Sequence, residues 1–238
     1  MSRRRPRPAL SPEQLTIAWQ SASLLLGYPD ESLLERLELV RAGSHELPDE
    51  VGGPIRDAVG RLGSTPLERL QEEYVETFDS RRRCNLYLTY FAHGDTRKRG
   101  VALLRFKQTY LRAGFLLDDE ELPDHLCVVL EFGATIDQRL GWGLVLDHRA
   151  GLELLRLSLR EIESPWHGAV DAVCATLPPL RGDERDAVRR LAAEGPPEEE
   201  VGLSPYGTAE LSPDPSVRAA SSGRPEELPM PTFPGARA

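Results

Sequence analysis

The sequence predicts an all-α protein with a single compact multi-helix domain. Apolar residues recur at helical spacing through most of the first 194 residues. Helix-start signals precede several of these periodic segments, and no stretch alternates apolar and polar residues for long enough to predict a strand. Hydrophobic residues make up 40% of the 238-residue chain, which is enough for a sizeable core.

The expected helices follow one another with few gaps. Ser11-Pro12-Glu13-Gln14 is typical of a helix start, and Asp30 begins a second helix after Gly27 and Pro29. Thr65 resembles the first residue of another capping box. The remaining expected helices are Arg81 to Phe91, Asp95 or Thr96 to Gly114, Pro123 to Leu140, Leu152 to Ile162, Pro165 to Leu177, and Asp183 to Ala193.

The composition changes at both ends of the chain. Residues 1–10 are predicted to be a disordered basic arm, because Glu13 and Gln14 follow where a secretory signal would be apolar. Residues 195–238 hold 9 of the 20 prolines and have no apolar periodicity. They are predicted to be a disordered Pro-rich tail, since such a segment buries too little surface to offset its ordering entropy. The helical domain is therefore expected at residues 11–194.

Charge and cysteine content narrow the classes of function. A net charge of −9 argues against a nucleic-acid partner, which would require clustered Lys and Arg. No apolar run approaches the ~20 residues that a membrane-spanning helix needs, so no direct membrane insertion is expected. The three cysteines form no CxxC and are too scattered for a disulfide framework, which favours a reducing, cytoplasmic location.

The sequence contains none of the common catalytic motifs, and we expect neither an enzyme nor a bound cofactor or metal. Glu121 and His125 are spaced i, i+4 and could supply two metal ligands, but two alone make an unconvincing site. A metal- or nucleotide-dependent enzyme using Glu72, Glu73 and Glu76 with this pair remains an alternative. Cys84 lies among apolar neighbours, which favours a buried, inert thiol.

Three local features are candidates for binding. The acidic run from Asp118 to His125 stands at an expected helix start; its carboxylates either complement the helix dipole or receive basic groups of a partner. Tyr87, Tyr90 and Phe91 would share one face of the expected helix, for the core or for a peptide groove. His93 begins a glycine turn, HGDTRKRG, that leads into a basic helix start, from which Lys98 and Arg99 are expected to reach acids elsewhere.

Three stretches resemble the nitrate reductase molybdenum cofactor assembly chaperones (NarJ type), a branch of the TorD-like redox-enzyme maturation proteins. They are LLLGYPD (24–30), EEYVETFDSRRRCNLYLTYFAHGDTRKRG (72–100) and ELPDHLCVVLEF (121–132). The motifs Y-x-E-x-F-D, HGDTR-x-RG and LPDHL carry the resemblance, which covers a little over half of the chain. Past Leu140 only helical character and length support it, and the Pro-rich tail matches none of the family's motifs.

The resemblance implies an all-helical, non-enzymatic protein of the TorD-like chaperone fold. It implies binding to the apo catalytic α subunit of a respiratory nitrate reductase, through that subunit's N-terminal segment, until the molybdenum cofactor is inserted. The chaperone would support enzyme assembly before membrane attachment without becoming part of the final enzyme. By this analogy the client-peptide site would comprise Tyr87, Tyr90, Phe91, His93, Glu121, Asp124 and His125. A chaperone for a different molybdoenzyme is the nearest alternative.

Overall fold

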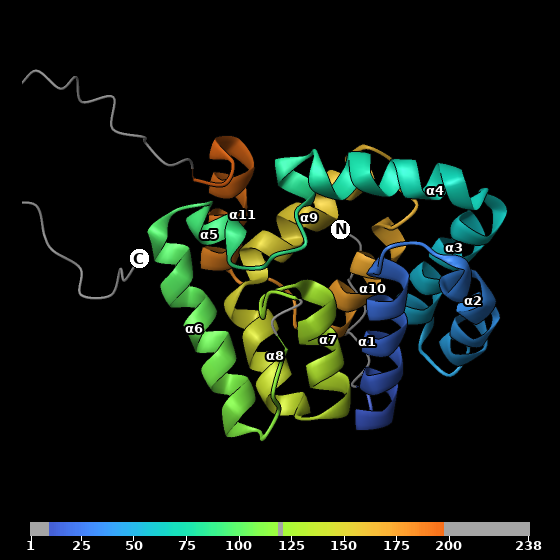
Figure 1. Ribbon diagram of the computed structural model, residues 1–238, viewed down its shortest axis with the longest axis horizontal. Helices are drawn as coiled ribbons and strands as arrows, with labels where there is room; N and C mark the ends of the chain where they lie inside the picture. Colours follow the sequence, from blue (N-terminus) through green and yellow to red (C-terminus); the bar gives the residue numbers. More distant parts are fainter. Residues whose placement is uncertain (1–9, 119–120, 198–238) are drawn as a thin grey trace, which may run out of the picture. The chain divides into compact units, whose positions relative to one another are not determined.

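Eleven α-helices and two short helical turns make up the part of the chain that the computed structural model describes, residues 10–118 and 121–197. These residues belong to one compact unit, and the only β-type pairing among them is a single isolated bridge (Figure 1). The all-α prediction is therefore confirmed. Residues 1–9 of the predicted arm and 198–238 of the predicted tail lie outside the described residues, as do Asp119 and Glu120 of the acidic run.

The first half of the domain is built from α1 (Pro12–Leu26), α2 (Glu31–Ser44), α3 (Asp49–Ser64) and α4 (Leu67–Tyr74). A π-helical turn, η1 (Val75–Asp79), continues α4. Ser11 and Gln14 form the expected capping box of α1, and the side chain of Asp30 caps α2. Both predictions of helix starts are confirmed.

The second half begins with a short 3₁₀ turn, η2 (Arg82–Cys84), and the four-residue α5 (Tyr90–His93). The longer helices are α6 (Arg97–Arg112), α7 (Leu126–Thr135), α8 (Gln138–Asp147), α9 (Arg149–Glu161), α10 (His167–Thr176) and α11 (Gly182–Glu194). Chain order thus leads away from the α2–α3 pair towards a second group of helices around α9.

Helix α1 lies at the centre of the packing and contacts α2, α3, α7 and α10. Its apolar side chains at the predicted positions, including Trp19, are buried. Trp166, just before α10, is also fully buried and packs edge-on against Tyr74 and Phe78. Two tryptophans from distant parts of the sequence therefore lie in one continuous core.

Helix α3 is the element that the sequence analysis missed. Four glycines and the internal Pro54 lower its helix propensity, yet Val51, Ile55, Val59 and Leu62 repeat at helical spacing and are buried. Its main partner is α10. A Cβ atom added at Gly168 of α10 would stand 2.2 Å from the backbone oxygen of Pro54, so only glycine permits this close crossing. Tertiary packing therefore outweighs weak local propensity.

Three other local predictions are wrong. Thr65 ends α3 rather than capping α4, and its hydroxyl donates to the carbonyl of Arg61. The helix expected over 123–140 begins only at Leu126 and is interrupted at Asp137, whose side chain caps α8 by accepting from the amide of Leu140.

The helix expected from Arg81 to Phe91 is also absent, because this segment forms non-local bonds instead. The side chain of Asn85 accepts from the amide of Tyr87, which diverts that amide from a helical bond. The next residues pair with the segment before α7: Leu88 N donates to Asp124 O at 3.0 Å, and Leu126 N donates to Leu86 O at 2.9 Å. Tyr87 and Tyr90–Phe91 therefore do not share one helical face.

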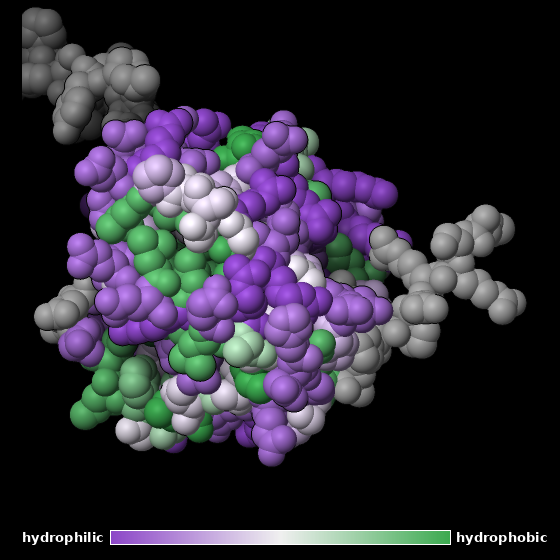
Figure 2. Space-filling view, turned by 90° about the vertical axis from the view of Figure 1, so that its right-hand side faces the viewer, coloured by the Kyte–Doolittle hydropathy of each residue, from purple (hydrophilic) through white to green (hydrophobic). Residues whose placement is uncertain are grey.

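Figure 2 shows the face on which α2, α3 and α4 lie, where hydrophilic surface surrounds a narrow strip of hydrophobic surface. Exposed apolar side chains in this region of the chain include Tyr28, Leu39 and Val75. Among the helices that the structure describes, none is long and apolar enough to cross a bilayer.

Candidate functional site

The two motif-bearing segments, 81–100 and 121–126, lie against each other. An antiparallel bridge joins Tyr87 to His125, and their rings meet edge to face with centroids 5.1 Å apart. The Tyr87 hydroxyl donates to Glu121 Oε1 at 3.3 Å. Three of the predicted site residues are thus brought together although 34 or more positions separate Tyr87 from the other two.

Asp124 is buried beneath this pair. Its Oδ2 accepts from both the amide and the hydroxyl of Thr89. Arg99, from the first turn of α6, places Nη2 3.7 Å from the same oxygen. Because the Asp124 side chain has no exposed surface, it cannot touch a partner in this conformation. Its predicted place in the lining of a groove is corrected to that of a positioning residue for Thr89 and Arg99.

Arg99 is the residue around which the cluster is organised. Its guanidinium carbon lies 5.2 Å from the ring centroid of Tyr87 and 5.9 Å from that of Tyr90, within cation–π range. Nε donates to the Thr89 hydroxyl, and Nη1 pairs with the exposed Asp95 at 3.4 Å. The expectation that Arg99 reaches acids is confirmed. Its central position was not predicted.

Burial sets the protonation of the cluster. It raises the pKa of Tyr87, with the Glu121 carboxylate adding to the effect, so the phenol stays protonated. Burial also lowers the pKa of His125, although Glu121 and Asp124 oppose this shift. The pKa of His93 is lowered by burial and by the positive neighbours His148, Lys98 and Arg105. Both imidazoles therefore favour the neutral form at neutral pH.

Tyr90 and Phe91 point to other surroundings. The Tyr90 hydroxyl accepts from Arg82 Nε at 2.8 Å. Phe91 is buried against α9, where a Cβ atom at Gly151 would stand 2.6 Å from it. His93 ends α5, directly before Gly94, whose φ of 55° favours glycine. The seven predicted residues therefore do not form one continuous groove.

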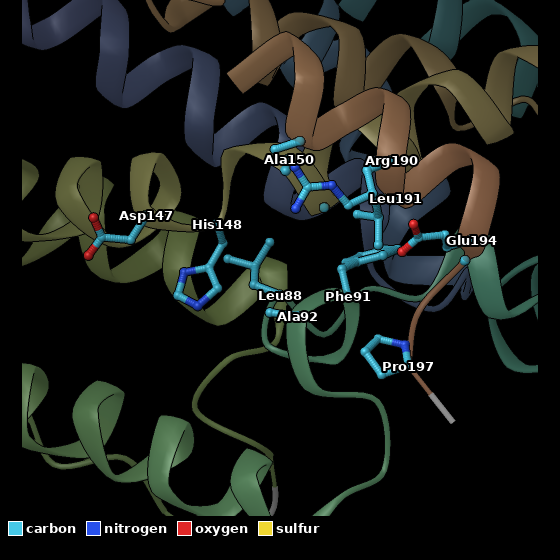
Figure 3. A pocket seen from close by; sticks show the side chains of 13 residues that line it. Leu88, Phe91, Ala92, Asp147, His148, Ala150, Arg190, Leu191, Glu194 and Pro197 are labelled. Atoms are coloured by element: carbon cyan, nitrogen blue, oxygen red, sulfur yellow. The ribbon is translucent and has the colours of Figure 1, made fainter. Parts of the chain in front are cut away.

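A pocket of about 410 Å³ opens beside the cluster, between α5, α9 and α11 (Figure 3). Leu88, Phe91 and Leu191 supply apolar surface, while Asp147, His148, Arg190 and Glu194 supply polar groups. Pro197 lies at its edge, and Arg82 Nη2 is 3.4 Å from the carbonyl oxygens of both Pro196 and Pro197. Most of these residues follow Leu140, where no motif pointed to a site. The amphipathic spacing within α9 and α11 was the only available signal.

The described residues do not support the metal-enzyme alternative. Nowhere in residues 10–118 and 121–197 do three His, Cys, Asp or Glu side chains converge on a position that could hold a metal ion. The cysteines are equally unreactive in character. Cys84 is buried, as expected, and burial raises its pKa to about 11.

Comparison with known proteins places these features in context. Residues 44–172, more than half of the chain, match the family model described as "Nitrate reductase delta subunit". The chain is 40% identical over 126 residues to the "Probable nitrate reductase molybdenum cofactor assembly chaperone NarJ" of Bacillus subtilis, covering 51% of this chain and 66% of that protein. It is 35% identical over 148 residues to the "Nitrate reductase molybdenum cofactor assembly chaperone NarJ" of Escherichia coli K12, covering 60% and 62%.

A longer relative is the "Nitrate reductase-like protein NarX" of Mycobacterium tuberculosis, 41% identical over 165 residues, which are 67% of this chain and 24% of NarX. The chain thus spans about a quarter of NarX and about two thirds or less of the NarJ proteins. The crystal structure of a "Putative Redox Enzyme Maturation Protein" from Archaeoglobus fulgidus superposes with a TM-score of 0.50. It is 24% identical and covers 74% of this chain and 97% of that one, which supports the helical fold alone.

Proposed function

The chain belongs to the nitrate reductase delta subunit family, and from this premise we propose that it is an assembly chaperone for a respiratory nitrate reductase. It binds the catalytic α subunit before the molybdenum cofactor is inserted and leaves before the enzyme attaches to the membrane. It acts in the cytoplasm and is not itself an enzyme. The similarity to the NarJ chaperones of Bacillus subtilis and Escherichia coli supports this function.

One structural observation carries the proposal: the motif residues fold into a single cluster beside an open, partly apolar pocket. The cluster is rigid, because Asp124 and Arg99 bond segments that are distant in sequence. The pocket is neither filled by side chains nor lined by a catalytic group. A pre-formed apolar pocket on a rigid frame is suited to non-covalent capture of a peptide.

The client's N-terminal segment is proposed to place apolar side chains in the pocket, against Leu88, Phe91 and Leu191. The acids at its rim, Asp147 and Glu194, attract basic groups of that segment and orient it. Apolar burial then provides most of the affinity. Tyr87, Glu121 and His125 form a second, half-buried edge that a longer segment can reach.

A substitution that fills the pocket tests this proposal. Ala92 lines the pocket from α5 and is exposed, so Ala92→Trp adds an indole to the space without removing any packing. Ala193→Trp on α11 is the matched control, because Ala193 is also exposed but does not line the pocket. The readout is fluorescence anisotropy of a labelled N-terminal peptide of the nitrate reductase α subunit from the same genome.

We expect Ala92→Trp to weaken peptide binding at least about tenfold, the loss of ~1.4 kcal/mol, and Ala193→Trp to leave it unchanged. Equal binding by both variants would place the peptide elsewhere on the chain. If the unmodified chain binds the N-terminal peptide of another molybdoenzyme instead, the chaperone mechanism stands and the client is different. Failure to bind any such peptide or the apo α subunit would refute the proposed function.

A further inference from the structure

Helix α6 presents two different apolar faces. Ala102, Phe106 and Tyr110 are buried against the domain. Val101, Leu104 and Leu111 lie on the opposite side and are 56–62% exposed. Figure 1 shows α6 along one edge of the helical assembly, where this outward side faces away from the other helices.

The apolar surface continues beyond the end of the helix. Leu116 is 79% exposed, and it borders a small hollow together with Lys107, Leu111 and Phe115. This strip, Val101–Leu104–Leu111–Leu116, runs along the length of α6, about 24 Å for 16 residues. A continuous exposed apolar strip of this kind marks an interaction surface more often than four scattered apolar residues would.

Basic side chains flank the strip. The helix contains six Lys or Arg residues and no Asp or Glu, in a chain whose net charge is −9. Of these, Arg97, Lys98, Arg105 and Arg112 are exposed, and no ion pair between described residues engages them. Arg97 and Lys98 also stand in the first turn, where the helix dipole disfavours positive charge. Local helix stability therefore does not explain this basic surface.

We propose that the outward face of α6 binds the surface of an anionic lipid bilayer. At 100° per residue, the exposed leucines and Val101 project from the crest of the helix, with Arg105 and Arg112 on one flank and Lys107 on the other. This is the arrangement of an interfacial helix, whose crest enters the headgroup region while its flanks contact acidic lipid phosphates. Nucleic acid would use the bases but not the leucines, and a convex crest fits a flat interface better than a pocket.

The test is flotation of the purified full-length chain with two kinds of vesicles. One kind contains phosphatidylcholine alone, and the other contains equal parts of phosphatidylcholine and phosphatidylglycerol. Arg105→Gln/Arg112→Gln removes two flanking charges, and Leu104→Ser/Leu111→Ser removes the crest. The matched controls are Arg69→Gln/Arg189→Gln and Leu39→Ser, which make the same kinds of change at exposed positions on other helices.

We expect binding to the anionic vesicles only, weakening as salt is added. Each lost base lowers the partition coefficient roughly fivefold, so the double arginine variant falls about 25-fold. The double leucine variant should lose binding to a similar degree, and both controls should retain it. Circular dichroism confirms that all variants are folded.

The proposal is overturned if the unmodified chain does not float with anionic vesicles at low salt, or if the controls lose as much binding as the α6 variants. Binding of the same face to polyglutamate but not to vesicles would identify it as a protein-docking surface and refute the lipid assignment. Peptide capture in the pocket is measured separately, so failure here leaves the proposed chaperone function untouched.

Discussion

The hydrogen bonds of Asp124 should make it one of the most important polar residues for the stability of the domain. Asp124→Ala removes the acceptor for the amide and the hydroxyl of Thr89 and the nearest buried carboxylate of Arg99. Hydrogen bonds to a charged group contribute about 1.5–3 kcal/mol each, and breaking a buried ionic arrangement costs about 3–5 kcal/mol. We therefore expect the free energy of unfolding to fall by about 3–5 kcal/mol.

Asp95→Ala is the matched control, since Asp95 pairs with the same arginine. Its side chain is 76% exposed, whereas that of Asp124 is fully buried. An exposed pair of this kind contributes about 0–1 kcal/mol. Asp124→Asn should fall between the two variants, because it keeps an oxygen acceptor for Thr89 but loses the charge near Arg99.

Guanidinium unfolding followed by tryptophan fluorescence measures these differences. Trp19 and Trp166 are fully buried in the core, so their emission reports global unfolding. A double-mutant cycle of Asp124→Ala with Thr89→Val isolates the Thr89 bonds, with an expected coupling of about 1–3 kcal/mol. If Asp124→Ala and Asp95→Ala differ by less than about 1 kcal/mol, burial does not strengthen this cluster and the argument from its geometry fails.

Two further predictions concern packing and pH. Gly168→Ala should destabilise the domain by about 2 kcal/mol or more in the same assay, because its Cβ would meet a backbone carbonyl of α3. Gly60→Ala, where a Cβ meets nothing within 4 Å, should instead stabilise it by up to about 1 kcal/mol; equal effects would refute the close crossing. The lowered pKa of His125 means that the unfolded chain binds a proton first, so stability should fall as pH drops below about 6.5. His125→Gln should flatten the fall measured between about pH 6.5 and 5.5, and an unchanged slope would contradict the assigned cause.

Local chemistry explains the elements that sequence analysis predicted well. The capping box of Ser11 and Gln14 and the cap of Asp30 involve atoms within three residues of each other. The apolar spacing of α1 likewise follows from the period of a helix. Such signals depend on neighbouring residues alone, so the all-α fold and most of the helices could be read directly.

The failures share a physical cause, which is competition from distant partners. Residues 86–88 leave the helical conformation because Asp124 and Leu126 supply their backbone bonds. Helix α3 forms despite its glycines because α10 packs closely against it. In both places the free energy gained from a non-local contact exceeds the local propensity, and local spacing contains no information about that contact.

The candidate site divides in the same way. The sequence by itself determined that segments 72–100 and 121–132 matter, because their motifs resemble one family of assembly chaperones. Only the tertiary structure decided that Asp124 is buried, that Arg99 joins the segments, and that the pocket draws half of its lining from α9 and α11. The physical reason is that exposure and ion pairing depend on which side chains meet in space, and the packing of the whole helical domain determines those meetings.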